Sequence, residues 1–250
     1  MRGVGMQGIG LSPAIQARTH WLPIWFVQFY QENDGINFGS GVNIDNLFNA
    51  DCTIEGYFQV TATPTAVAYP LSKNNGGAGN GWRMFINAGL VVNFIAFFGG
   101  VNININTGAF VLRLRQWYHI AVDFDVGTLT ARLCIDGIPR AQGIAVGAYQ
   151  ADAANNLICN GVLNVGIVDD YMKVGPIRLS SARRYTGASF TPPNYADWPA
   201  NDANAQLITR MMDKTGAIAT DYSGNGYNGA ITFGVNTRWY SEPFLGVVKR

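Results

Sequence analysis

The sequence predicts an all-β protein built as an antiparallel sandwich or barrel. Helical periodicity is nearly absent, and short alternating or apolar runs bounded by Gly, Asn, Asp and Pro recur from about residue 35 onward. A chain of 250 residues is long enough for one large domain with a substantial core. The expected strands are, in order, 36–38, 42–44, 52–61, 66–73, 81–87, 91–98, 101–105, 118–125, 129–135, 163–168, 174–179, 206–211 and 230–234.

The clearest element is a β-hairpin over residues 118–135. In its first arm the even positions from Tyr118 to Phe124 are apolar, and the odd positions from His119 to Asp125 form the opposite face. We therefore expect one face in the core and the other against solvent or a second layer. Residues 101–106 (VNININ) alternate in the same way, with Ile inward and a row of Asn outward.

The ends of the chain differ from this pattern. We expect residues 1–30 to form an extended N-terminal arm, residues 31–238 the sandwich domain, and residues 239–250 a C-terminal tail. The arm is rich in Gly and ends in an aromatic cluster that includes Trp21, Trp25 and Phe29. Apolar clusters outside a core usually mark an interface, so these three residues are expected to make an assembly contact.

Composition excludes several classes of protein. The charged fraction is only 13%, and 17 basic against 16 acidic residues leave a net charge of +1. The chain therefore lacks the excess of basic residues that nucleic-acid binding requires. The apolar stretch at 21–30 is interrupted and too short to span a bilayer, so no membrane insertion is expected. No signal-peptide pattern opens the chain, and we expect production in a bacterial cytoplasm.

Cysteines and histidines give no metal-binding pattern. Cys52, Cys134 and Cys159 are odd in number, widely spaced and in strand-like contexts, which favours buried free thiols. There is no C-x-x-C, and the only histidines are His20 and His119.

Six motifs in order resemble the laminin-G-like branch of the concanavalin A-like lectin/glucanase superfamily. The segment 117–122 (WYHIAV) with 133–137 (LCIDG) resembles its "W-x-H-hydrophobic-A … hydrophobic-D-G" hairpin. The others are 36–41 (INFGSG), 52–58 (CTIEGYF), 71–73 (LSK) with 81–84 (GWRM), 175–180 (GPIRLS) with 182–185 (ARRY) and 190–193 (FTPP), and 221–226 (DYSGNG).

The resemblance implies a two-sheet antiparallel jelly-roll sandwich. Such folds host lectins, glycosidases, adhesion modules and virion parts, so the fold does not settle the function. Versions with this D-x-S-G-N-G and R-Y-T … F-T-P-P character recur in structural proteins of tailed bacteriophages, which implies a virion setting.

Glycoside hydrolysis requires paired carboxylates. The three Glu residues form no such pair, and the nearest candidates, Asp123 and Asp125, are interpreted instead as solvent-facing residues before a turn. His119 matches the family's structural histidine and is expected to be a satisfied structural imidazole. We predict no catalytic site.

Calcium is the only cofactor with candidate ligands, because Asp and Asn at turns offer the hard oxygens it prefers. Asp221 with Asn225, and Asp169 with Asp170, are the candidates. Asp221 is equally explained as the acceptor of local backbone N–H groups in a turn, and that interpretation is favoured.

Glycan binding needs an exposed aromatic ring beside hydrogen-bonding side chains. Trp82 beside Asn80, and Tyr171 beside Asp169 and Asp170, fit this description, although Trp82 also matches a core position of the family.

The leading hypothesis is a non-enzymatic virion structural or surface protein, as a decoration, fibre or tail module that contacts other virion proteins or copies of itself and binds a cell-surface glycan for host attachment. The alternative is a cellular carbohydrate-binding lectin-like module. A glycoside hydrolase ranks third for lack of paired carboxylates.

Overall fold

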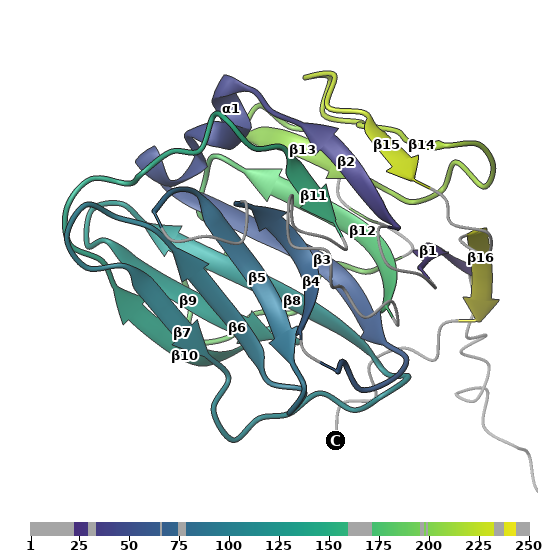
Figure 1. Ribbon diagram of the computed structural model, residues 1–250, viewed down its shortest axis with the longest axis horizontal. Coiled ribbons are helices and arrows are strands. Elements are labelled where there is room, and N and C mark those ends of the chain that lie inside the picture. Colours follow the sequence, from purple (N-terminus) through teal and green to yellow (C-terminus); the bar gives the residue numbers. More distant parts are fainter. Residues whose placement is uncertain are drawn as a thin grey trace, which may run out of the picture.

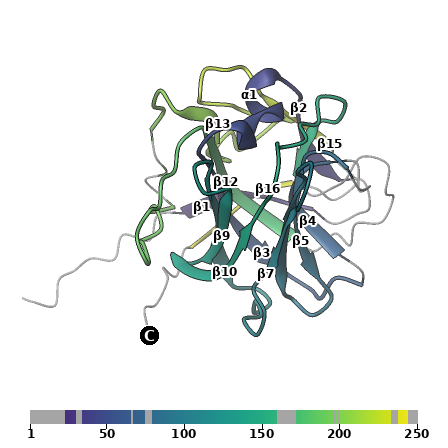
Figure 2. The same cartoon turned by 90° about the vertical axis from the view of Figure 1, so that its left-hand side faces the viewer.

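The computed structural model describes residues 23–29, 34–65, 67–74, 79–159, 172–195, 198, 200–232 and 238–243. Within them, two antiparallel sheets pack face to face as a sandwich (Figures 1 and 2). This architecture confirms the predicted all-β jelly-roll class. No helix of the described residues is long and apolar enough to cross a membrane.

The back sheet runs β10-β9-β8-β3-β12-β1-β16, with β13 also paired to β12. Strand β12 therefore has β3 on one side and, on the other, β13 along its C-terminal half and β1 near its N-terminal end. Its strands are β10 (Ile138–Ile144), β9 (Thr130–Ile135), β8 (Trp117–Asp125), β3 (Cys52–Val60), β12 (Met172–Ser180), β1 (Pro23–Gln28), β16 (Arg238–Pro243) and β13 (Ala205–Thr209).

The front sheet runs β14-β15-β2-β11-β4-β5-β6-β7. A short helix α1 (Val42–Asp45) and a 3-10 turn η2 (Leu47–Asn49) link β2 to β3 at one end of the sandwich (Figure 1). The strands are β14 (Ile218–Ala219), β15 (Gly229–Thr232), β2 (Gly35–Gly39), β11 (Leu157–Cys159), β4 (Val67–Lys73), β5 (Trp82–Asn87), β6 (Val92–Ala96) and β7 (Ile103–Asn106).

The 118–135 hairpin and the alternating Asn strand are confirmed. Strands β8 and β9 pair from Ile120↔Ile135 to Asp125↔Thr130, and the even positions of β8 lie in the core. In β7, Ile103 and Ile105 are buried and the Asn side chains are exposed. The three cysteines are buried free thiols, as predicted.

The expected strand at 42–44 is wrong, because these residues form α1. Asp45 accepts hydrogen bonds from the Gly41 N–H at 3.2 Å and the Ser40 hydroxyl at 2.8 Å, which closes a helical turn where an extended chain was expected. The expected strand at 163–168 lies outside the described residues. Five strands were not predicted, namely β1, β10, β11, β14 and β16.

The expected domain boundaries are also wrong at both described ends. Residues 23–28 form β1, which pairs with β16 over six consecutive positions and with β12 at Val27↔Val174. Phe29, expected at an assembly contact, has 0% exposure and belongs to the core. Residues 23–29 and 238–243 are thus parts of the back sheet rather than an arm and a tail, and residues 1–22 lie outside the described part.

Phe48 of η2 sits at the centre of the core between the two sheets. Its ring centroid lies 5.1 Å from that of Phe124 on β8, 5.8 Å from that of Phe94 on β6 and 5.4 Å from that of Tyr149. A linker residue therefore joins the layers, and packing at this density leaves no room to repack around a lost ring.

We expect Phe48→Ala to lower the free energy of unfolding by about 3–5 kcal/mol, because it removes a fully buried ring and leaves a cavity. Val42→Ala is the matched control, since Val42 is 70% exposed on the preceding helix and should change stability little. Urea unfolding followed by tryptophan fluorescence measures both. Equal, small losses would show that Phe48 does not join the two layers.

Candidate functional site

The outer face of the back sheet carries buried polar side chains beside a cluster of aromatic and apolar ones. Glu55 of β3 lies opposite Arg178 of β12. On the other side of β3, His119 of β8 lies opposite Tyr57, two residues along the strand from Glu55. Glu55, Arg178 and His119 are all buried. Residues 181–195, which we call the strap, cross this face and cover it (Figure 2). The second layer considered for the odd-numbered face of the hairpin is therefore present.

Glu55 is the centre of one buried cluster. Its carboxylate accepts hydrogen bonds from Arg178 Nε at 2.6 Å and from the Tyr185 hydroxyl of the strap, and His119 Nε2 lies 2.9 Å from Oε2. Burial alone would raise the pKa of Glu55, but the hydrogen bond and charge of His119 and the charge of Arg178 outweigh it and lower that pKa. His119 is buried, as a structural imidazole would be, but the expectation of a fully satisfied ring is wrong: Nε2 lies beside Glu55, whereas the buried Nδ1 has no hydrogen-bond partner among the described residues.

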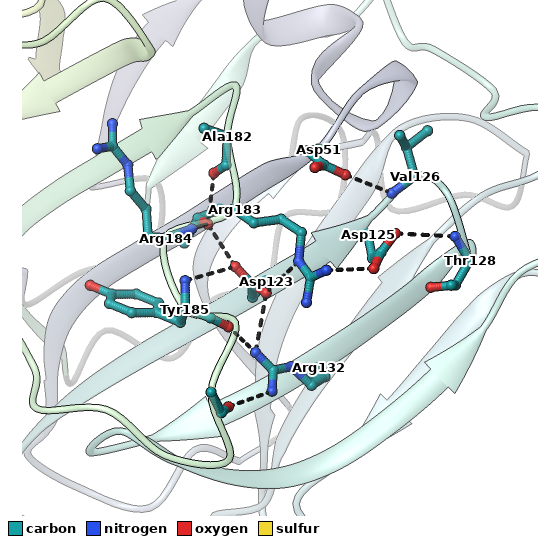
Figure 3. Close-up of polar contacts among 12 residues, drawn as sticks. Asp51, Asp123, Asp125, Val126, Thr128, Arg132, Ala182, Arg183, Arg184 and Tyr185 are labelled. Carbon is teal, nitrogen blue, oxygen red and sulfur yellow. Dashed lines mark hydrogen bonds and ion pairs between the residues drawn. The ribbon is translucent and has the colours of Figure 1, made fainter.

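Asp123 is the centre of a second cluster, which Figure 3 shows in close-up. Its carboxylate lies 3.1 Å from Arg183 Nε and 3.3 Å from Arg132 Nη2, and it accepts a hydrogen bond from the Thr53 hydroxyl at 3.0 Å. Arg183 also pairs with Asp125. The interpretation of Asp123 as solvent-facing is wrong. The strap covers it to 1% exposure, and Arg183 of the strap balances its charge.

The strap is held by hydrogen bonds and ring packing along its length. The Tyr57 hydroxyl donates to the Pro193 carbonyl at 2.7 Å, and the Tyr195 hydroxyl donates to the Trp25 carbonyl at 2.6 Å. The rings of Tyr185 and Phe190 stack against each other, and both meet the His119 ring edge-on. The back face is therefore sealed where the strap crosses it, and its carboxylates are structural.

The outer face of the front sheet carries a different set of side chains. On β5, Arg83 and Phe85 alternate with the buried Trp82 and Met84, so they point outward and are half-buried. The pairing register places Asn93 of β6 beside Phe85 and continues through β6 to β7. We call five outward residues of β4 to β7 the front patch: Tyr69, Arg83, Phe85, Asn93 and Asn104.

The aromatic part of the front patch is a small cluster. The rings of Tyr69 and Phe85 lie 6.0 Å apart between centroids, and the Arg83 guanidinium carbon lies 5.8 Å from the Phe85 centroid. Burial raises the pKa of Tyr69, and the charge of Arg83 opposes that shift. Strands β4 to β7 contain no Asp or Glu, so Arg83 sets the charge of the patch among their residues.

The structure corrects the predicted glycan-binding tryptophan. Trp82 is fully buried beside Phe48, because its position on β5 faces the core. Asn80 is exposed in the turn before β5, and its carbonyl accepts a hydrogen bond from Asn74. Asp169, Asp170 and Tyr171 lie outside the described residues. The alternation along β5 places the neighbouring Arg83 and Phe85 on the outer face, and the family motif at 81–84 does not indicate this.

The turn interpretation of Asp221 is confirmed. Its carboxylate accepts hydrogen bonds from the backbone N–H groups of Ile208, Ser223 and Tyr227 at 2.8 to 3.1 Å. The Asn225 side chain donates to the Ala205 carbonyl at 3.0 Å. Among the described residues, no group of three His, Cys, Asp or Glu could hold a metal ion. Calcium binding at Asp221 and Asn225 stays a prediction.

The expected assembly residues are placed in part. Trp25 is half-buried on β1, and the Lys214 ammonium lies 4.9 Å from its ring centroid. Phe29 is buried within the domain, as described above, and cannot contact another chain. Trp21 lies outside the described residues.

The Glu55 cluster predicts how stability depends on pH. Because the pKa of Glu55 is lower in the folded state than in the unfolded chain, its stabilising contribution is fully present above the ordinary Glu pKa of about 4.3. That contribution is lost as the pH falls through the lower, folded value. Glu55→Gln should cost about 3–5 kcal/mol at pH 7, since it leaves Arg178 without its buried counter-charge.

The measurement is urea unfolding of both proteins from about pH 7 to about pH 3. The gap between wild type and Glu55→Gln should be widest at neutral pH and narrow below about pH 4. A gap that stays constant with pH would show that Glu55 gains nothing from ionisation in the folded state.

Comparisons with known proteins agree with this fold. A sequence model described as the concanavalin A-like lectin/glucanases superfamily matches residues 31–175. A search of curated proteins found no match. A solved structure of a candidate carbohydrate binding protein from Bacteroides ovatus is similar, with a TM-score of 0.61 and 14% identity over 88% of this chain. This chain spans 60% of that protein.

Two other similar structures match less of this chain. The CBM40 module of the Ruminococcus gnavus IT-sialidase, bound to α2,3-sialyllactose, gives a TM-score of 0.45 and 17% identity over 61% of this chain and 90% of that one. A pentraxin from Limulus polyphemus gives a TM-score of 0.45 and 12% identity, over 64% of this chain and 77% of that one. Since the superfamily model matches more than half of the sequence and the fold agrees, the chain belongs to the concanavalin A-like lectin/glucanase superfamily.

Proposed function

We propose that this protein is a non-enzymatic carbohydrate-binding module that binds a glycan on the front patch. The observation that carries the proposal is the contrast between the two sheet faces. The strap seals the polar face of the back sheet, whereas the front sheet presents a half-buried aromatic ring beside amide and guanidinium groups. Membership of a lectin-like superfamily and the similarity to a carbohydrate-binding fold support it.

The chemistry of the front patch suits a sugar. Phe85 offers an apolar ring for the C–H face of a pyranose, and amide groups on the next two strands offer hydrogen bonds to hydroxyls. Asn93 donates its amide N–H to the Val91 carbonyl at 2.9 Å, which directs its side-chain oxygen to accept from a ligand. Asn104 is exposed one strand further along. Together these side chains would hold a sugar against β5 and β6.

The absence of catalysis is also part of the proposal. Of the two carboxylates nearest to a hydrolytic pair, Asp123 is buried under the strap in ion pairs with Arg183 and Arg132, and the half-buried Asp125 is paired with Arg183. The described strands β4 to β7 of the front patch bring no carboxylate of their own. A pair of carboxylates flanking a bound sugar, as glycoside hydrolysis requires, is therefore not built on these strands.

Phe85→Ala should weaken glycan binding by about tenfold or more, because the ring contributes stacking beyond its buried area. A glycan array identifies the sugar class, and calorimetry with that sugar compares wild type with Phe85→Ala. Tyr222→Ala is the matched control, since Tyr222 is an exposed aromatic ring outside the front patch. Equal affinity of wild type and Phe85→Ala, or release of reducing ends from the bound glycan, would contradict the proposal.

The setting in which the module acts is a second part of the proposal. We infer from the motifs at 182–193 and 221–226 that it lies on the surface of a phage-like particle, where it would contact other virion proteins or further copies and attach to a host glycan. Because residues 23–29 belong to the sandwich, the assembly contact would come from residues before Pro23.

We therefore expect the full chain to form a larger species in solution than a chain that begins at residue 23. Light scattering coupled to size-exclusion chromatography measures both masses. The shortened chain keeps β1 and should unfold at the same urea concentration as the full chain, which controls for damage to the fold. If both chains are monomers, the assembly part of the proposal fails while the glycan-binding part is unaffected.

A further inference from the structure

Lys73, the last residue of β4, is fully buried with its ammonium group surrounded by oxygen atoms. Its Nζ lies 3.0 Å from Asp45 Oδ1 and 3.5 Å from the Ser40 hydroxyl, and it donates to the backbone carbonyls of Asp152 and Asn155. A buried ammonium is costly unless it is paired and hydrogen-bonded. The four oxygens meet that requirement, so we call this group the Lys73 cage.

The ligands of the Lys73 cage come from two segments outside β4. Ser40 and Asp45 belong to the turn and helix after β2, and the two carbonyls belong to the loop before β11. A carboxylate, a hydroxyl and two carbonyls are the oxygen types that bind a hard cation such as Ca²⁺ between loops. Here the chain supplies the positive charge itself.

The loop that carries the two carbonyls is shaped in advance. The Asp152 carboxylate, almost fully buried, accepts hydrogen bonds from the backbone N–H groups of Ala154 at 3.2 Å and Asn155 at 3.1 Å. The Asn155 side-chain amide also donates to it at 2.7 Å. The Asp152 carboxylate thus fixes the shape of the loop, and the backbone carbonyls of Asp152 and Asn155 remain to accept from the Lys73 ammonium.

The Lys73 cage connects directly to the front patch. Asn74 follows Lys73, and its side chain donates to the Asn80 carbonyl while its Oδ1 lies 3.5 Å from Arg83 Nη1. Gly81 passes so close that a Cβ there would lie 1.9 Å from the Lys73 carbonyl. Its N–H donates to the Gln150 carbonyl at 2.7 Å. The position of Arg83 therefore depends on where β4 ends.

We propose that the Lys73 ammonium takes the place of a bound cation between these loops and, through Asn74, positions Arg83 for glycan binding, so that binding needs no divalent ion. The stability part of this inference stands alone, and the binding part rests on the proposed function. Lys73 acts on the front patch through its neighbours and is a positioning residue.

The wild-type protein gives the first test. Its melting temperature, and its affinity for the glycan found on the array, should be the same in EDTA and in excess Ca²⁺. A melting temperature or an affinity that falls in EDTA would overturn the inference, because a bound metal would then hold the loops. If the array shows no glycan at all, the proposed function fails while the melting arm still decides the role of Lys73.

Chemical rescue gives the second test. Lys73→Ala should melt roughly 10 °C below wild type, because it leaves the Asp45 carboxylate and two carbonyls unpaired. n-Propylammonium has the atoms that the substitution removes and should raise the melting temperature of Lys73→Ala while leaving wild type unchanged. n-Propanol, a neutral molecule of similar size, should not. Equal rescue by both would show that Lys73 only fills space.

A milder variant keeps the inference falsifiable if Lys73→Ala does not fold. Asp45→Asn removes the counter-charge and retains an oxygen, so it should lower the melting temperature and weaken glycan binding together. Arg113→Ala, at an exposed cation outside the Lys73 cage and the front patch, is the control and should change neither. An Asp45→Asn protein that melts and binds like wild type would overturn the inference.

Discussion

The burial of two carboxylates on the outer face of the back sheet constrains the rest of this structure. Glu55 and Asp123 lie on adjacent central strands, where an unpaired charge would cost several kcal/mol. Arg178 pairs with Glu55 from the neighbouring strand, but Arg183 and Tyr185 reach the two carboxylates only if the strap lies across the sheet. The strap also keeps water away, so the ion pairs and the covering layer require each other.

This constraint also explains how a chain with so few charged residues uses them. Four of its charged residues are buried and held in ion pairs: Glu55, Lys73, Asp123 and Arg178. These charges therefore stabilise the interior rather than the surface. The outer face of β4 to β7 carries amide side chains, the rings of Tyr69 and Phe85, and Arg83, and none of these strands contains an Asp or Glu. Amide groups beside aromatic rings suit neutral hydroxyl groups, which agrees with the proposed glycan site.

Local patterns predicted much of the fold, and long-range contacts account for the errors. The alternation in β7 and β8 and the Asp221 turn depend on residues close in sequence, and all three are confirmed. Asp123 was placed in solvent because its cover comes from about sixty residues further along the chain. The pairing of β1 with β16 joins the two ends of the sequence, which no local pattern reports.

The errors at the candidate site have a different cause. Trp82 was chosen for its residue type beside a loop, although the alternation of β5 assigns it to the core and Arg83 and Phe85 to the surface. The in–out alternation of side chains along β5 alone identifies Arg83 and Phe85 as its outward residues. Lys73 could not be identified in this way, because its oxygen ligands come from segments that only the folded sandwich brings together.

Different parts of the chain complete the outer faces of the two sheets. Residues 31–175 contain the whole front patch and both buried carboxylates, whereas Arg178 and the strap follow that region. Without the strap, Glu55 and Asp123 would lie on an open face of the back sheet. The residues after 175 convert that face into a second buried layer. The C-terminal part of the chain therefore decides whether the outer face of the back sheet is open or covered.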